Sequence, residues 1–398
     1  SPWWQGLGTV LVASMLVTSL VMGGRSLGWL QSWELNAWDA LSDLRPSEPP
    51  DRRLLLVKIN ELDVRQLNEY PINNEDLLRV LKKIDQYNPR LIGINLALYP
   101  AREPGRQALI EYLQDHDRVI SVCNAGEDDR PQDIIYPLPG VSSSFLGFTD
   151  LTYDEFSQNN PVRRHLLKTR RSHPCNTNSS FSYKLALKYL EEEGYTESKT
   201  SNKQIEIGNQ VIPRVNSNSG GYQVRGKNIE DFDGYQTLIN YRQSNPIAEE
   251  RNVAEILDGS INTELHDLVR DRIVLIGNEN IGTNFYSTPN LRLSHVDVNA
   301  HLTSQIISAV LDERPLITWW SQGQEALWIW IWSSIGSLVA WLTKKSFIFT
   351  LGIAIAAGSI LVIGFVFLIN GVWIPTIPAI LALILTGLGI LFYKEAYV

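Results

Sequence analysis

Cysteine and histidine, the residues that most often bind transition metals, are scarce in this 398-residue chain, which has two cysteines and six histidines. The histidines are scattered, no H-E-x-x-H sequence occurs, and no group of cysteines has the spacing of a zinc site. These absences argue against a zinc hydrolase and a structural zinc module. We therefore expect neither a bound metal ion nor a cofactor.

Glycine-rich loops that bind nucleotide phosphates are also missing. The nearest sequence, Gly277–Gly282 (GNENIG), follows a predicted strand but lacks the middle glycine of the dinucleotide fingerprint. The serines Ser142–Ser144 have no base nearby in the sequence, and a solvated loop explains them better than a nucleophile does. The sequence thus predicts no catalytic residue, and we expect a protein that is not an enzyme.

An excess of basic residues is absent as well. The chain has 43 acidic and 35 basic residues, which gives a formal net charge of −8. Nucleic-acid-binding proteins need a basic surface against the phosphates, so a nucleic-acid partner is not expected. Anionic lipid headgroups are equally poor partners for the acidic middle of the chain.

Long apolar runs are present, and their positions are the most informative feature of the sequence. One run is Trp3–Met22, and three more lie near the other end: Ala326–Leu342, Phe347–Ile369 and Val372–Tyr393. A helix of about 20 apolar residues crosses the ~30 Å hydrocarbon core of a bilayer. A cleaved signal peptide is the alternative for the first run, but a basic leading segment and a small-residue cleavage site are missing, which favours an uncleaved anchor.

The runs divide the chain into an anchor at 1–30, a polar domain at 31–322 and a three-helix membrane region at 323–398. We therefore expect an integral, multi-pass protein in contact with membrane lipids.

Basic residues in the short loops predict the orientation. Lys344 and Lys345 separate the second and third runs, and Lys394 follows the fourth. The positive-inside rule places these lysines in the cytoplasm, and four spans return the N-terminus to the same side. The large domain is then periplasmic or lumenal, with both termini cytoplasmic. Arg25, on the outer side of the first span, is a minor count against this orientation.

Within the polar domain, short apolar runs alternate with segments of helical periodicity. The order is Leu54–Ile59, Asn73–Tyr87, Leu91–Leu96, Gln107–Gln114 and Val119–Val122. This β-α-β-α-β order predicts an α/β domain with a mostly parallel central sheet and flanking helices. Further expected elements are a helix at Phe181–Glu193, a hairpin at Ile205–Ile212, strands at Thr237–Tyr241 and Arg272–Ile276, and a helix at Val298–Leu311.

Both cysteines, Cys123 and Cys175, lie in this domain. An oxidising compartment would permit a disulfide between them. The sequence does not show that their Cα atoms approach within the ~7 Å that a bridge requires, so two buried thiols are the alternative.

Charged residues near the predicted strands are candidates for a ligand pocket. Glu61 and Asp63 follow the first strand, and ligands of parallel α/β sheets favour the carboxyl ends of the strands. A turn or helix cap is the alternative role for these two acids. Arg163 and Arg164 could bind a carboxylate, with an ion pair as the default.

Several short motifs follow one another along the domain in a recognisable order. They are Trp38-Asp39 with Asp43–Pro46, Val57–Glu61, Ile92–Asn95, Pro161–Leu167, Arg272–Gly277, Thr288-Pro289 and His295–His301. Together with the one-plus-three arrangement of apolar runs, they resemble the type-2 CHASE family (cyclases/histidine kinases associated sensory extracellular) of bacterial transmembrane receptors. The Arg163–Leu167 stretch is similar to cyanobacterial members associated with caspase-like CHAT peptidase domains.

The chain departs from the family pattern at three acidic positions, where Asn60, Asn95 and Asn284 replace the usual aspartates. An amide keeps the size of the acid but loses the anionic oxygens that a cation prefers. The resemblance therefore implies a neutralised pocket without a divalent cation. The ligand-pocket candidates are Asn60, Glu61, Asp63, Asn95, Arg163, Arg164, Asn284, Thr288, Asp297 and His301.

The resemblance implies a membrane-bound sensory module that detects a ligand or partner and signals through four membrane helices to a cytoplasmic effector. That effector is a kinase, a cyclase or a CHAT-type peptidase, fused or separate. The sequence stops at Val398, soon after the fourth run, so we expect a cut chain or a separate effector. The alternative is a non-catalytic structural or assembly subunit of a homo-oligomer or larger membrane complex.

Overall fold

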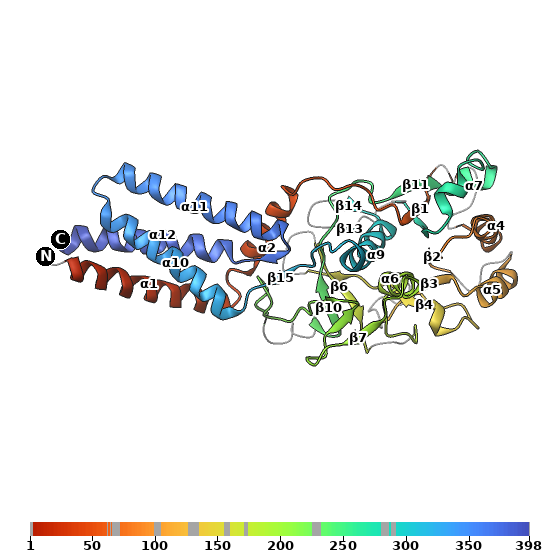
Figure 1. Ribbon diagram of the computed structural model, residues 1–398, viewed down its shortest axis with the longest axis horizontal. Coiled ribbons are helices and arrows are strands. Elements are labelled where there is room, and N and C mark those ends of the chain that lie inside the picture. Colours follow the sequence, from red (N-terminus) through yellow and green to blue (C-terminus); the bar gives the residue numbers. More distant parts are fainter. Residues whose placement is uncertain are drawn as a thin grey trace.

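The computed structural model describes residues 3–61, 63, 65, 72–98, 105–125, 135–154, 160–170, 174–224, 232–279, 286–287 and 292–397. An α/β domain stands at one end of an elongated molecule and a bundle of four long helices at the other (Figure 1). The N- and C-terminal ends lie together at the far end of the bundle (Figure 1).

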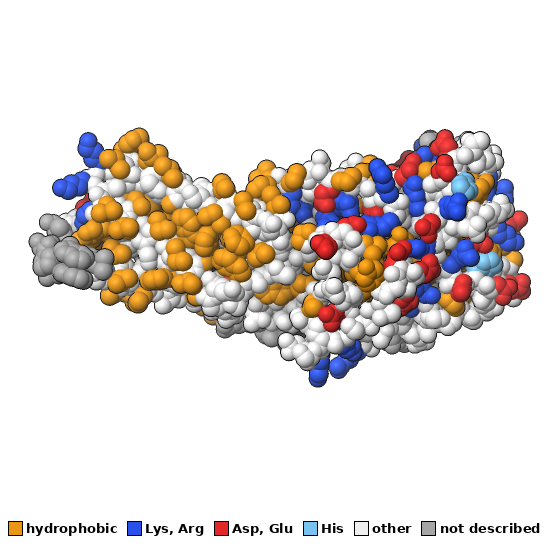
Figure 2. Space-filling view, viewed as in Figure 1, with side chains coloured by type: hydrophobic (Ala, Val, Ile, Leu, Met, Phe, Trp, Pro, Cys, Tyr) orange, Lys and Arg blue, Asp and Glu red, His pale blue; other side chains and the backbone are white. Residues whose placement is uncertain are grey.

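Four helices in the described residues are long and apolar enough to cross a membrane, as the sequence predicts. They are α1 (Trp3–Ser26), α10 (Gln322–Leu342), α11 (Ser346–Ile369) and α12 (Thr376–Tyr397). Hydrophobic side chains cover the bundle, whereas charged side chains gather over the α/β domain (Figure 2). The fourth helix begins later than its apolar run, because Val372–Trp373 form strand β16, which pairs in parallel with β15 (Thr318–Trp319).

Helix α12 packs closely on α10. A Cβ atom on Gly336 of α10 would overlap the backbone carbonyl of Leu383 in α12, so only glycine permits this approach. Lys394 of α12 is one of the three lysines that the sequence analysis predicts to be cytoplasmic. Its Nζ atom donates to the carbonyls of Ala340, Trp341 and Thr343, each at 3.0 Å. Two of these carbonyls end α10, so Lys394 caps that helix.

The central sheet of the α/β domain is parallel throughout, in the order β11-β1-β12-β2-β3-β4. The predicted mostly parallel sheet is thus confirmed. The strands are β1 (Leu54–Ile59), β2 (Leu91–Asn95), β3 (Val119–Cys123), β4 (Leu146–Phe148), β11 (Glu249–Asn252) and β12 (Ile273–Asn278). Strand β12, late in the sequence, inserts between β1 and β2.

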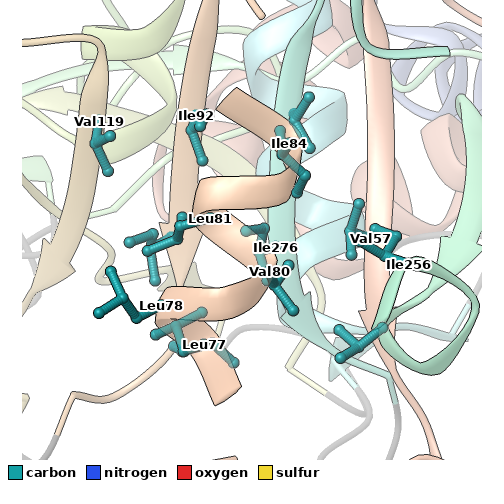
Figure 3. Packing of buried hydrophobic residues seen from close by; sticks show 14 of the residues in the cluster. Val57, Leu77, Leu78, Val80, Leu81, Ile84, Ile92, Val119, Ile256 and Ile276 are labelled. Carbon is teal, nitrogen blue, oxygen red and sulfur yellow. The ribbon is translucent and has the colours of Figure 1, made fainter. Parts of the chain in front are cut away.

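Helices cover both faces of this sheet. Helices α4 (Asn74–Asp85), α5 (Arg106–Asp115) and α7 (Val253–Asp258) lie on one face, and α6 (Phe181–Glu192) and α9 (His295–Leu311) on the other. Leu77, Leu81 and Ile84 of α4 point toward Val57, Ile92 and Ile276 of the strands (Figure 3). Alternate residues of β1 therefore enter opposite cores, with Leu55, Val57 and Ile59 under α4 and α7, and Leu54 and Leu56 under α6 and α9.

Smaller elements complete the domain. Strands β5 (Thr152–Tyr153), β6 (Val162–Lys168) and β10 (Tyr235–Leu238) form one antiparallel sheet, and β7 (Glu197–Lys199), β8 (Ile205–Ile207) and β9 (Gln210–Val211) form another. The pair β13 (Tyr286–Ser287) and β14 (Arg292–Leu293) precedes α9, and α8 (Leu265–Val269) precedes β12. Helix α9 starts three residues before the predicted Val298 because Ser294 and Asp297 form a capping box.

A helix that the sequence analysis does not predict, α2 (Gln31–Asp43), lies where the bundle meets the α/β domain (Figure 1). Its Leu35 and Trp38 are buried in a cluster with Tyr222 of the domain and with Leu368 and Trp373 from the α11–α12 region. Helix α2 therefore contacts both parts of the molecule.

Cys123 and Cys175 form a disulfide with their Cα atoms 5.3 Å apart, and both residues are fully buried. The bond joins the end of β3 to the segment before α6. It closes a loop with a sequence separation of 52 residues.

The double variant Cys123→Ala/Cys175→Ala is expected to lower the free energy of unfolding by about 2–4 kcal/mol, because the unfolded chain loses a crosslink over a long loop. Thermal unfolding of the purified chain in detergent measures the change. Wild-type protein treated with reductant is the matched control, and it should lose a similar amount. An unchanged unfolding midpoint in both samples would contradict this assignment of the bond.

Candidate functional site

The carboxyl edge of the central sheet carries a row of three residues in register: Lys58 of β1, Gly277 of β12 and Asn95 of β2. The residues directly before them, Val57, Ile276 and Ile94, belong to the core under α4, α5 and α7, so the three residues themselves face α6 and α9. A Cβ atom on Gly277 would lie 2.6 Å from the Cβ of Val296, so the absence of a side chain lets the first turn of α9 rest on the sheet. We call Lys58, Gly277 and Asn95 the sheet-edge row.

On one side of Val296, His295 contacts the row through Asn95. The His295 Nδ1 atom lies 2.9 Å from Asn95 Oδ1, and its Nε2 atom lies 3.0 Å from the Thr149 carbonyl. Burial lowers the pKa of His295 to about 4, although the Thr149 carbonyl favours the charged ring. Both of these oxygens are acceptors, whereas a neutral ring has one N–H donor, so at neutral pH His295 donates to only one of them.

On the other side of Val296, Asp297 contacts the row through Lys58. The Lys58 ammonium lies 2.9 Å from Asp297 Oδ1 and 2.6 Å from Glu250 Oε1 of β11. Burial alone would lower the pKa of Lys58, but the carboxylates of Asp297 and Glu250 outweigh it and raise this pKa. Lysine is thus held charged at a buried position between two acids, and α9 is fixed to the sheet by one neutral and one ionic contact.

Asn60 and Asp63, two predicted pocket residues, bind each other's backbone. The Asn60 N–H donates to Asp63 Oδ2 at 2.7 Å, and the Asp63 N–H donates to Asn60 Oδ1 at 2.9 Å. Asp63 also accepts from the Ala254 N–H at the start of α7, at 2.8 Å. These contacts are those of the cap that the sequence leaves as an alternative. Glu61 is exposed beside them, with Arg65 at 4.0 Å.

Arg163 and Arg164 of β6 lie in a separate, buried group of charges. Arg163 makes a two-pronged contact with Asp39 of α2, and its Nη1 atom lies 3.0 Å from Asp154 Oδ2. Arg164 donates to the other oxygen of Asp154 at 2.9 Å and stacks 4.3 Å from the Phe232 ring. We call Arg163, Arg164, Asp39 and Asp154 the domain cluster, and it joins α2 to the small antiparallel sheet.

His301 is buried two turns into α9 and does not contact the sheet-edge row. Its ring meets Tyr241 edge-on with centroids 5.2 Å apart, and burial lowers its pKa to about 3. Asn284 and Thr288 lie outside the described residues. The structure therefore brings together Asn95 and Asp297 through α9, and leaves Arg163, Arg164 and His301 elsewhere.

A second group of buried charges was not predicted from the sequence. The Arg25 guanidinium at the end of α1 contacts Glu34 of α2 at 2.8 Å, Glu325 of α10 at 2.6 Å and the Gly220 carbonyl at 2.6 Å. The exposed fractions of the three charged side chains are 1–3%. We call Arg25, Glu34 and Glu325 the junction cluster, because it joins two bundle helices, α2 and the α/β domain.

The segment 219–222 connects the two clusters. Gly220 supplies its carbonyl to Arg25, and a Cβ atom on Gly221 would overlap the Trp373 ring, so this turn lies flat against β16. The next residue, Tyr222, donates its hydroxyl to Asp154 of the domain cluster. One short turn thus contacts both clusters and the α11–α12 connection.

Signals for the junction cluster are present in the sequence. Arg25 is the first charged residue of the chain, and it ends an apolar helix. Glu34 lies in the first turn of α2, and Glu325 lies in the first turn of α10. A lone charge at the end of a membrane segment needs a buried partner or water, so a search for acids at the other segment ends would have proposed this pairing.

The residues of these sites show no metal-ligand set. Among the described residues, no three His, Cys, Asp or Glu side chains converge as metal ligands. The sheet-edge row and the neighbouring His295 together offer an amide, a neutral imidazole and a paired lysine. These groups suit recognition of an uncharged polar group by hydrogen bonds.

Comparison with known proteins gives one match. A family model of the CHASE2 domain matches residues 16–338, which include the second part of α1, the whole α/β domain and most of α10. No curated protein and no solved structure matches the chain.

The variant Asn95→Asp is expected to raise the pKa of His295 by about one to three, because a carboxylate would face the ring Nδ1 atom and favour its charged form. Histidine-labelled full-length protein, titrated by NMR with a His295→Gln variant for assignment, gives this pKa. Asn262→Asp adds the same charge at an exposed position and should leave the His295 titration unchanged. An unaltered pKa in Asn95→Asp would show that the two side chains do not interact.

Proposed function

The chain belongs to the CHASE2 family of sensor domains, and we propose that it is the input module of a membrane-bound signalling system. The α/β domain detects a ligand or partner and shifts the packing of four membrane helices. The shift then biases an effector on the other side of the membrane. A kinase, a cyclase or a CHAT-type peptidase, fused or separate, is the class of effector proposed.

The orientation follows from the charges at the end of the bundle away from the domain. Lys344, Lys345 and Lys394 belong to that end, together with both termini (Figure 1). The positive-inside rule supports a cytoplasmic position for these lysines. The α/β domain is then periplasmic or lumenal, where its Cys123–Cys175 disulfide is stable.

The junction cluster is the observation that carries the proposal. Separating one partner of a buried ion pair costs ~3–5 kcal/mol, so movement of α2 or of Gly220 displaces Arg25 and Glu325 rather than breaking their contacts. Helices α1 and α10 therefore follow the domain. A signal requires two arrangements of the protein that bind the ligand with different affinities. The junction cluster supplies the mechanical link between the α/β domain and the membrane helices.

Helix α12 is the proposed output element. It packs against α10 through the Gly336–Leu383 approach, and its Lys394 caps the end of α10 that lies away from the domain. In the middle of the bundle, the Ser333 hydroxyl of α10 bonds to Thr386 of α12 at 3.0 Å and to the Ser14 carbonyl of α1 at 3.2 Å. A displacement of α10 is passed to α12 along its whole length.

A structural or assembly subunit remains the second candidate, and the sheet-edge row favours it. Asn95 and Lys58 are already bonded within the chain, to His295, Asp297 and Glu250. A ligand at this site would have to displace hydrogen bonds and ion pairs that these groups already make within the chain. In this second function the domain docks on another subunit and sends no signal.

A fusion to a reporter tests the first function. The cytoplasmic catalytic domain of a sensor-dependent adenylate cyclase is joined after α12, and its product is measured in cells. We expect Arg25→Gln to change basal output several-fold, because the junction cluster then loses its cation and two buried acids face each other. Deletion of residues 54–311 should abolish any response to external stimuli.

The matched control is Arg292→Gln, which removes an exposed arginine of the α/β domain. It should leave output at the wild-type level. Equal output from wild type, Arg25→Gln and the deletion under all stimuli would overturn the sensory function and favour the structural subunit. Membrane levels of each fusion are compared by immunoblot, so a misfolded variant is recognised.

The junction cluster also predicts a pH dependence of stability. Burial raises the pKa of Glu34 to about 7, although Arg25 acts in the opposite direction. A raised pKa in the folded state means that the Glu34 contribution is complete below its unfolded value of 4.5 and is lost as the pH rises through about 7. The thermal midpoint of the full chain in lipid nanodiscs should fall over this range, and Glu34→Gln should flatten the fall.

Glu313→Gln removes an exposed acid and is the control for this measurement. It should retain the wild-type slope. If Glu34→Gln unfolds with the same pH dependence as wild type, Glu34 does not bind a proton in the folded protein.

A further inference from the structure

An exposed, largely apolar face runs from the end of α1 along α2. Leu27, Trp29, Trp33 and Leu44 have exposed fractions of 51%, 73%, 60% and 68%, and Ala40 is exposed between them. We call these five residues the juxtamembrane face. Large exposed apolar residues that cluster in this way mark an interaction surface.

The face follows the helical period of α2. Trp33, Ala40 and Leu44 are seven and four residues apart, which places them on one side of the helix. The opposite side holds Glu34, Leu35 and Trp38, which are buried against the junction cluster and the α/β domain. Helix α2 therefore carries large apolar residues on its outward side as well as on its buried side.

The juxtamembrane face continues the outer surface of α1. Val12, Leu16 and Leu20 are exposed at intervals of four residues, and Leu27 lies seven residues further on the same side. These residues form the lipid-facing stripe of a helix that is long enough to span a bilayer. The ring of Trp29 lies next to α1, because a Cβ atom on Gly24 would be 3.4 Å from it.

The face has one exposed charged neighbour, Asp43, at its Leu44 end. Between Ser26 and Ser42 the only charged residues are Glu34 and Asp39, and both bind arginines of the protein, Arg25 and Arg163. With no basic residue between Ser26 and Leu44, the face has no cation to pair with anionic headgroups. Tryptophan, with an apolar ring and one N–H donor, is enriched where hydrocarbon meets headgroups.

We propose that the juxtamembrane face docks in the headgroup region of the bilayer leaflet next to the α/β domain, with zwitterionic phospholipid as its partner. Helix α2 then rests on the membrane through Trp29 and Trp33 while it holds the junction cluster through Glu34 and the domain cluster through Asp39. A change in lipid packing at this interface would therefore act on both clusters through α2. This docking does not depend on the sensory function proposed above.

Site-directed spin labelling of the full chain in phosphatidylcholine nanodiscs tests the docking. Nitroxides are attached to Trp29→Cys and Trp33→Cys, and the native cysteines stay unlabelled because they are joined in a buried disulfide. Leu20→Cys, on the lipid-facing stripe, and Glu111→Cys, exposed on α5 at the far end of the domain, are the two reference positions. Collision rates with oxygen and with a water-soluble nickel chelate are measured for each label.

We expect labels at 29 and 33 to collide with the nickel chelate several-fold less often than the label at 111, and with oxygen nearly as often as the label at 20. Frequent nickel collisions at 29 and 33 would place the face in water and overturn the proposal. Rare collisions with both reagents would show that protein covers the face, from a second copy or another subunit, and would overturn it as well. Unchanged size-exclusion elution confirms that each labelled chain is folded.

Discussion

The architecture depends on one buried guanidinium. Arg25 lies at the end of a membrane helix and is almost fully buried, where an unpaired charge is very unfavourable, so acids from other segments must contact it. The contact with Glu34 holds the first turn of α2 at the end of α1, and the contact with Glu325 holds the first turn of α10 at the same place. The Gly220 carbonyl brings the α/β domain to the same point. The charge requirement of one side chain thus sets the relation of the domain to the membrane helices.

The sheet edge is organised by a comparable constraint at smaller scale. Because Gly277 has no side chain, α9 rests on the middle of the parallel sheet, and its first turn meets Lys58 on one side and Asn95 on the other. The polar groups at the carboxyl end of the strands are therefore used to hold a helix. This is the reason that the edge is both the conventional ligand position of an α/β sheet and, in this chain, largely occupied by its own residues.

The sequence is informative wherever structure is local or strongly periodic. The four apolar helices and the β-α-β order depend on neighbouring residues, and the structure has them as expected. The central place of β12 depends on packing between distant segments, and no pattern in Ile273–Asn278 distinguishes a central strand from an edge strand. Helix α2 was missed because its buried side carries Glu34, which a periodicity argument assigns to solvent.

The same limit applies to the candidate site. Asn60 and Asp63 are near in sequence, so a cap was a foreseeable alternative to a pocket, whereas Arg25 and Glu325 are 300 positions apart and only folding joins them.

The contact between Lys394 and the end of α10 has a consequence for any domain that is joined to α12. Because Lys394 binds the end of α10, it fixes the rotation of α12 about its own axis. A domain attached after α12 is therefore held in one orientation about that axis. Each residue inserted beyond it turns the attachment by about 100°, and seven residues restore it to within about 20°.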